Sequence, residues 1–226
     1  MLLLALDTSA AATVALLRDD VVVGRFASAD TRSHAEVLAP AVRRILAEAG
    51  VAGTELDAVV AGVGPGPFTG LRAGLVTART LGFVWGVPLH GVMSLDALAF
   101  DAASCGAVPA GSSFLAGTDA RRGEVYWAAY CAPSEPGALP ELLDGPHVGT
   151  AATLPPGQPL VGRAAGLYPD DVDGVPAFSH ADPDAASLAR VARLRLLAGV
   201  PLRDTSPLYL RESDAQVPGP RKRATA

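Results

Sequence analysis

A segment rich in glycine and proline, GVGPGPFTG at residues 62–70, separates an apolar run from an amphipathic run in this 226-residue chain. The apolar run at 56–63 predicts a strand buried on both faces, because such strands are apolar almost throughout. The amphipathic run predicts a helix over 69–85. A buried strand that turns tightly into a helix indicates an α/β architecture with parallel strands.

The elements around this segment extend the α/β prediction to the first hundred residues. Three short apolar runs joined by tight turns predict a meander of strands, and helices then alternate with single strands. This order matches the ribonuclease-H-like core that actin, sugar kinases and the Hsp70 ATPase domain share. The expected elements are strands at 2–7, 13–19, 21–28 and 88–92, with helices at 33–50 and from Ser94.

A domain boundary is expected at 105–113, where small residues, glycine and proline gather. Beyond it we expect a hairpin over 113–130 that turns at the sequence RRG, then short, loop-rich elements in the stretches dense in proline and glycine. A last helix is expected over 183–199, with packing back on the first subdomain left open. The expected divisions are a first subdomain at 1–104, a reduced second subdomain at 105–210 and a disordered tail at 211–226.

Composition narrows the class of protein. Half of the residues are hydrophobic, so the chain has the material for a core. The formal net charge of −5 argues against a protein that grips nucleic acid through its general field. Two separated cysteines without a Cys/His cluster make a disulfide framework or a structural zinc site unexpected. No apolar run approaches the ~18 residues of a membrane span. We therefore expect a soluble, cytoplasmic protein with no membrane partner.

The glycine-rich segment does not carry a nucleotide motif. A P-loop needs a lysine and a series of backbone N–H donors, but no lysine is present here and Pro65 and Pro67 lack N–H groups. The dinucleotide fingerprint needs a third glycine where this chain has Thr69. The segment is therefore expected to fix the entry angle of the following helix rather than to hold phosphate.

The helix at 69–85 carries a stripe of small residues. Gly70, Gly74, Ala78 and Gly82 are four residues apart and share one face. Each helical glycine costs about 1 kcal/mol relative to alanine, a cost that makes sense where another backbone must come close. The approaching backbone could belong to a partner or to the chain's own sheet, and the sequence leaves both open.

Few residues are candidates for chemistry. Asp7, with Thr8 and Ser9, ends the first strand, where it could lie near phosphate and magnesium or simply satisfy a turn. The charged hairpin tip around Arg121 and Arg122 is a solvated turn or a contact with a partner. Isolated histidines and the absence of a GxSxG elbow exclude a zinc protease or a serine hydrolase motif. We expect no catalytic residue and no metal site.

Several blocks together resemble the bacterial TsaB (YeaZ) family, the dimerization subunit of the complex that makes threonylcarbamoyladenosine in tRNA. The resemblance covers nearly the whole chain and rests on the blocks LALDTSAAATVALL, SHAEVLAPAV, GVGPGPFTGLRAGLVTARTLGF, GVMSLDALA, TDARRGEVYWAAY and SPLYLRESDA. It implies an actin-like fold in two subdomains, the second one reduced. It also implies a non-catalytic subunit that binds and activates the catalytic subunit TsaD, helps to recruit the ATPase TsaE, and reaches tRNA through the complex.

The resemblance further implies how the subunits pair and where a nucleotide lies. Family members pair through the helices here at 33–49 and 69–85, with TsaD or with a second copy. TsaD carries an HxxxH metal segment where this chain reads MSLDA at 93–97. No intrinsic cofactor is implied, while ATP or ADP with magnesium could lie at the complex interface near Asp7, Thr8 and Ser9. The expected interface residues are Val42, Gly70, Leu71, Gly74, Leu75, Ala78 and Gly82.

The sequence departs from the family pattern at one position, and one alternative function stays open. Pro67 stands where many relatives have serine, which weakens any anion contact inherited at that point. An enzyme of a different class, a small actin-fold ATPase or phosphotransferase that uses Asp7 and magnesium, is the second hypothesis.

Overall fold

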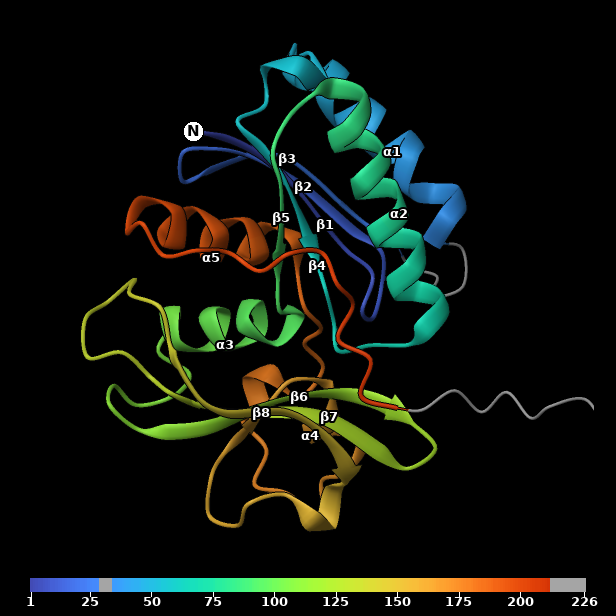
Figure 1. Ribbon diagram of the computed structural model, residues 1–226. Helices are drawn as coiled ribbons and strands as arrows, with labels where there is room; N and C mark the ends of the chain where they lie inside the picture. Colours follow the sequence, from blue (N-terminus) through green and yellow to red (C-terminus); the bar gives the residue numbers. More distant parts are fainter. Residues whose placement is uncertain (29–33, 212–226) are drawn as a thin grey trace, which may run out of the picture.

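The computed structural model describes residues 1–28 and 34–211. It is a stack of layers, with two helices, a five-stranded sheet, two further helices and a four-stranded sheet following one another (Figure 1). The strands of the first sheet are β1 (Leu2–Asp7), β2 (Thr13–Arg18), β3 (Val21–Ala27), β4 (Ala58–Gly62) and β5 (Leu89–Val92).

The first sheet has the strand order β3-β2-β1-β4-β5. The pairs β1–β2 and β2–β3 are antiparallel, whereas β1–β4 and β4–β5 are parallel. A three-strand meander that continues into parallel strands joined by helices is the ribonuclease-H-like, actin-type arrangement. The expected fold class is therefore confirmed.

Both faces of this sheet are covered by helices. On one face lie α1 (His34–Ala49) and α2 (Phe68–Trp85), and on the other lies α5 (Ala185–Leu197). Side chains alternate between the faces of a strand: Leu4 and Leu6 of β1 join the core under α1 and α2, and Ala5 joins the core under α5.

The second sheet has the order β8-β7-β6-β9 and is separated from the first by α3 (Ser94–Ser104). Most residues of α3 are buried, because it packs against both α5 and the second sheet. The short helix α4 (Arg163–Leu167) covers the outer face of that sheet. The strands are β6 (Ser113–Arg121), β7 (Glu124–Cys131), β8 (Glu141–Thr150) and β9 (Leu160–Val161), and the 3₁₀ turns are η1 (Gly53–Glu55), η2 (Ala151–Thr153) and η3 (Pro176–Phe178).

One expectation about the second half is wrong. The stretch after the hairpin was expected to hold only short elements, yet β8 is ten residues long. It contains Pro146, which has no N–H to donate, but β8 is an edge strand and needs ladder bonds on one side only. Register shifts in its pairing with β7 take up the irregularity near this proline.

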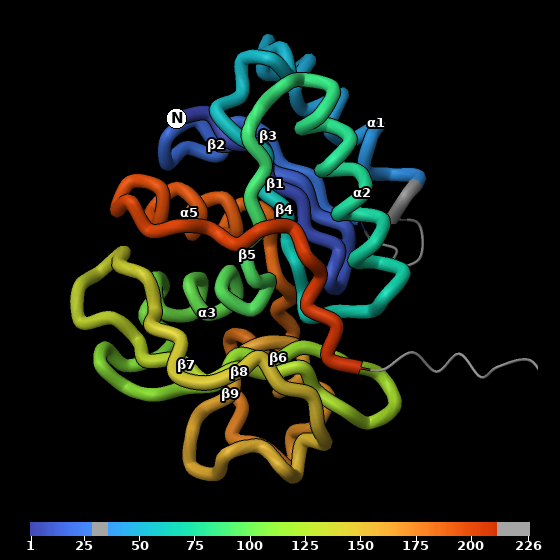
Figure 2. Tube along the Cα trace, viewed as in Figure 1, coloured from blue at the N-terminus to red at the C-terminus, as the bar shows by residue number. Residues whose placement is uncertain are grey.

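The C-terminal part of the described chain returns to the first sheet. After α5 ends, the chain runs back past β5 and α2 towards the tip of the β6–β7 hairpin (Figure 2). The division into 1–104 and 105–210 stays a prediction, and the expected tail at 211–226 lies outside the described residues except for Arg211. Among the helices of the described ranges, none is long and apolar enough to cross a membrane.

Candidate functional site

Asp7 lies at the carboxyl end of β1 and is almost completely buried, with 1% of its surface exposed. Its Oδ1 accepts hydrogen bonds from the backbone N–H of Ser9 at 2.8 Å and from the Ser9 hydroxyl at 2.6 Å. Its Oδ2 accepts a bond from the hydroxyl of Ser94 at 2.5 Å. Burial raises the pKa of this carboxyl, and the bonds from Ser9 and Ser94 oppose that rise.

Ser94 connects Asp7 to the glycine-rich segment. Its hydroxyl oxygen accepts a bond from the backbone N–H of Gly64 at 3.2 Å, and its own N–H donates to the Gly64 carbonyl at 2.8 Å. A Cβ on Gly62 would fall 1.8 Å from Oδ2 of Asp7, so only glycine fits beside this carboxylate. The first turn of α3 is therefore tied to the end of β1 and to Gly64, near the start of the β4–α2 connection.

The turn after β1 is closed against α2. The Thr8 hydroxyl donates to the Gly70 carbonyl at 2.8 Å, and a Cβ on Gly74 would lie 2.3 Å from the same hydroxyl. A Cβ on Gly66 would lie 2.7 Å from Cα of Ser9. The turn thus sits directly on the backbone of the glycine-rich segment and of α2.

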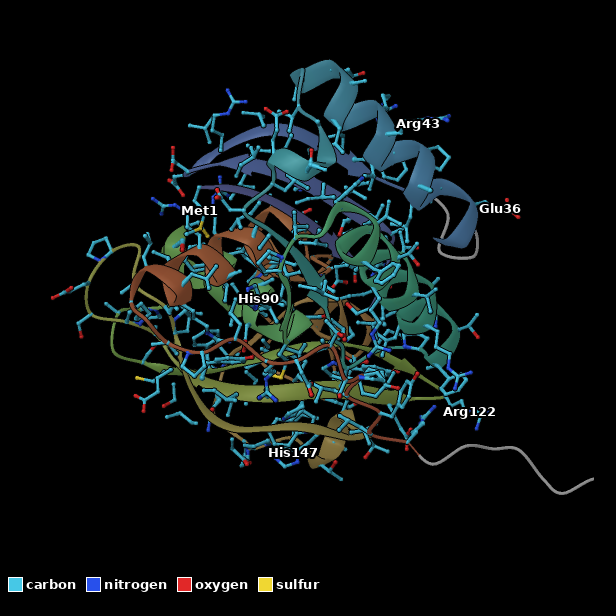
Figure 3. The ribbon with its side chains drawn as sticks, turned by 45° about the horizontal axis from the view of Figure 1, so that its top comes forward. Met1, Glu36, Arg43, His90, Arg122 and His147 are labelled. Atoms are coloured by element: carbon cyan, nitrogen blue, oxygen red, sulfur yellow. The ribbon has the colours of Figure 1, made fainter. Side chains whose placement is uncertain are left out.

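These contacts limit what the Asp7 turn can do chemically. Both oxygens of Asp7 are taken by hydroxyls and a backbone N–H of the chain itself, so the residues around it do not fit a magnesium ion held by this carboxylate. Over the described ranges, no group of three or more His, Cys, Asp or Glu residues could hold a metal. His90 and His147 lie on different sheets, well apart (Figure 3). The hydrogen bonds of this turn instead connect the end of β1 with α3, with the glycine-rich segment and with α2.

The small-residue stripe of α2 faces the chain's own sheet, and its expected contact with a partner stays a prediction. Gly74 lies against Thr8, Ala78 is in the core beneath α1 and α2, and a Cβ on Gly82 would be 3.4 Å from Cβ of Leu89. The close approach predicted from the glycines is therefore real, but the backbone that approaches belongs to the chain's own sheet. The remaining expected interface residues, Gly70, Val42, Leu71 and Leu75, are buried as well.

The opposite face of α2 exposes large apolar side chains, and sequence reasoning missed it. Phe68, Val76 and Phe83 are 50%, 60% and 88% exposed. At 100° per residue these three positions fall within about 80° of the helix circumference. Val84 beside them is exposed too. Phe83 could have been noticed, since at 100° per residue it lies about 160° around the helix from the centre of the small stripe. Apolar side chains gathered on one exposed face mark an interaction surface.

Comparisons with known proteins agree with this fold. A family model described as TsaD, tRNA N6-adenosine threonylcarbamoyltransferase, matches residues 23–143. An uncharacterized protein of Mycobacterium tuberculosis is 39% identical over 94% of this chain and 93% of its own length. The structure of YeaZ from Pseudomonas aeruginosa superposes with a TM-score of 0.76 at 30% identity, covering 92% of this chain and 100% of that chain.

The chain belongs to the TsaB/YeaZ family. The Escherichia coli protein named tRNA threonylcarbamoyladenosine biosynthesis protein TsaB is 38% identical over 58% of this chain and 55% of its own length. The resemblance inferred from the sequence motifs is thereby confirmed. In this TsaB/YeaZ chain, the small residues of α2 therefore face the chain's own sheet.

The β6–β7 tip of this TsaB/YeaZ chain is a charged turn. Arg121 pairs with Asp119 at 3.1 Å, and Arg211 pairs with Glu124. Arg122 lies at the end of the hairpin (Figure 3). Both Arg121 and Arg122 have positive φ, at 64° and 57°, which is uncommon for residues other than glycine. Contact of these arginines with tRNA stays a prediction.

Proposed function

We propose that this chain is a non-catalytic subunit in the synthesis of N6-threonylcarbamoyladenosine in tRNA, and that it binds and activates a TsaD-type catalytic subunit in the cytoplasm. The observation that carries the proposal is the exposed apolar face of α2, on which Phe83 is the most exposed side chain, at 88%. The names of the TsaB relatives support the pathway.

The partner surface of the proposal differs from the one expected from sequence. The helix is the same, but the contacting side chains are Phe68, Val76, Phe83 and Val84 rather than the buried glycine stripe. Exposed aromatic side chains are frequent anchors in interfaces, where a few residues supply most of the binding energy. The same face could join two copies when the partner is absent.

The internal use of Asp7 argues against the second hypothesis, a phosphotransferase that holds magnesium at this residue. Its carboxylate oxygens are occupied by Ser9 and Ser94, and the turn is packed on α2. If TsaE docks on the complex, ATP or ADP with magnesium is therefore proposed to be held at an interface with the other subunits, and tRNA to be reached through the complex.

The test is to mix the chain with TsaD of the same organism, and then to compare Phe83→Asp with a matched variant, Leu197→Asp. Leu197 is also exposed, at 62%, but lies on α5. Phe83→Asp should weaken binding by at least about tenfold and lower threonylcarbamoyl transfer by the mixture. Leu197→Asp should leave both unchanged. A wild-type chain that forms no complex, measured by light scattering after size exclusion, would overturn the proposal.

A further inference from the structure

The last described segment, residues 203–211, crosses three separate parts of the molecule, and we call it the strap. Arg203 forms both bonds of an antiparallel bridge with Gly91 on the edge strand β5, at 2.8 and 3.2 Å. A Cβ on Gly91 would lie 2.1 Å from the carbonyl oxygen of Asp204. The strap therefore depends on a glycine at this point of β5, and it covers that edge of the sheet.

The strap is next bound to α2 through two arginines, Arg72 and Arg79, that lie within its exposed face. The guanidinium of Arg79 donates to the carbonyl of Thr205 at 2.7 Å and to its hydroxyl at 3.0 Å. Nε of Arg72 donates to the hydroxyl of Tyr209 at 3.3 Å. Both arginines of the helix surface therefore hold the strap.

An aromatic cluster closes this contact at the first residue of α2. The rings of Phe68 and Tyr209 have their centroids 4.9 Å apart, and the Arg72 guanidinium lies 3.8 Å from the centre of the Phe68 ring. Phe68 and Tyr209 are both partly exposed, at 50% and 39%. The strap thus places a third aromatic side chain, that of Tyr209, directly beside the two phenylalanines of the proposed partner surface.

The far side of the strap is anchored in the body of the protein. The N–H of Leu208 donates to the carbonyl of Val63 at 2.8 Å, and the Leu208 side chain packs against two of the hydrophobic cores. Arg211 pairs with Glu124 at the hairpin tip. A segment anchored at β5, at the start of the glycine-rich segment and at the hairpin is a fixed support for α2.

The beginning of α2 has little support of its own. Its N-cap is Pro67, which makes no side-chain capping bond, and its first turn has no acidic residue. Gly70 and Gly74 lower its intrinsic helix propensity further. The contacts from Thr8 on the inner side and from the strap on the outer side replace what the sequence of the helix lacks.

We infer that the strap is a positioning element of the partner surface: it holds the first half of α2 in place and adds Tyr209 beside Phe68 at the end of that surface. The inference rests on the proposed function, because the occupant of the surface is the TsaD-type subunit. The surface that this subunit would contact extends from α2 to Tyr209, since the rings of Phe68 and Tyr209 touch.

The test uses the full chain with Tyr209→Ala, Tyr209→Phe and Ser206→Ala. The alanine variant loses the ring contact and the bond to Arg72, whereas the phenylalanine variant keeps the ring. Among the described residues, the N–H and hydroxyl of Ser206 bond within their own turn, to Asp204, so Ser206 serves as the control. Each variant is measured by hydrogen exchange over 68–79 in the isolated chain and by its affinity for TsaD.

Tyr209→Ala should speed exchange over 68–79 and weaken affinity by about three- to tenfold, the range expected for one aromatic pair. Tyr209→Phe should retain most of both properties, and Ser206→Ala all of them. Unchanged exchange in Tyr209→Ala, or faster exchange with unchanged affinity, would overturn the inference. A wild-type chain that does not bind TsaD overturns the proposed function instead, and the exchange data then still decide whether the strap holds α2.

Discussion

The hydroxyl of Ser94 lies 2.5 Å from Oδ2 of Asp7, so the first residue of α3 donates a hydrogen bond to the carboxylate that ends β1. The same hydroxyl accepts the N–H of Gly64. One serine therefore joins the first strand, the β4–α2 connection and the helix between the two sheets. In this chain the residues at the end of β1 therefore hold α2 and α3 in place through hydrogen bonds.

Replacing Ser94 by alanine should destabilise the protein without changing its fold. The variant leaves Oδ2 of Asp7 and the N–H of Gly64 buried without their partner, at a cost of about 1–3 kcal/mol. Urea unfolding followed by circular dichroism measures the loss. Ser112→Ala is the control, because within the part of the chain that the structure describes the Ser112 hydroxyl bonds only to the nearby Pro109 carbonyl at the surface. Equal stabilities of the two variants would contradict the role assigned to Ser94.

Replacing Asp7 by asparagine should change how stability depends on pH. Burial raises the pKa of Asp7 above its ordinary 3.8, so the folded chain keeps this proton at pH values where the unfolded chain has lost it. The stability from this proton is complete below the ordinary pKa and is lost as pH rises through the folded pKa. The variant lacks this titration, so its stability relative to the wild type should rise from about pH 4 upwards and then level off.

Asp19→Asn provides a control of opposite sign for the pH experiment. The N-terminal amine, 2.7 Å away, lowers the pKa of Asp19, so its contribution is lost as pH falls. The stability of this variant relative to the wild type should therefore fall as pH rises. A pH-independent difference between Asp7→Asn and the wild type, measured by urea unfolding at several pH values, would contradict the assigned burial.

The first sheet could be predicted from sequence because its strands and helices carry clear periods. The buried run at 56–63 became β4, and the amphipathic run after it became α2 within one residue of the expected start. The long edge strand β8 was missed, because Gly145 and Pro146 interrupt its pattern and only the neighbouring strand shows that ladder bonds are needed on one side.

The direction of the glycine stripe could not be predicted from α2 alone. A row of small residues demands a close approach but does not say which backbone approaches. The answer depends on Thr8, which is remote in sequence and meets Gly74 only in the folded chain. The role of Ser94 was hidden for the same reason: nothing in its local sequence indicates that it faces Asp7.

Alanine at Gly74 and at Gly82 should have opposite effects on stability. Both substitutions gain helix propensity, by about 1 kcal/mol. At Gly82 the new Cβ makes an ordinary contact with Leu89, so this variant should be stabilised by up to that amount. At Gly74 the new Cβ displaces the Thr8 hydroxyl from its bond to Gly70, so this variant should lose about 1–3 kcal/mol. Denaturant midpoints of the two variants test this, and a stabilised Gly74→Ala would show that the stripe does not face the sheet.

Arg195→Met should lower the stability of the folded chain more than Arg190→Met, a matched change on the same helix α5. Arg195 donates to Oδ2 of Asp96 at 2.9 Å, while the Tyr130 hydroxyl donates to Oδ1, so that α5 and β7 are joined through α3. Burial raises the pKa of Asp96 and the arginine opposes this rise. Methionine keeps the packing of the stem but leaves a buried carboxylate with one partner, which should cost about 2–4 kcal/mol after allowance for the 21% exposure of the Arg195 side chain.

The matched change is Arg190→Met, one helical turn or so earlier, where the arginine faces Asp20 at 3.7 Å and Asp20 is 73% exposed. An exposed pair of this kind contributes at most about 1 kcal/mol. Thermal unfolding of both variants should therefore show a clearly larger drop in Tm for Arg195→Met. Equal drops would mean that Asp96 is protonated and satisfied by Tyr130 alone, and that the link between the two sheets does not depend on the arginine.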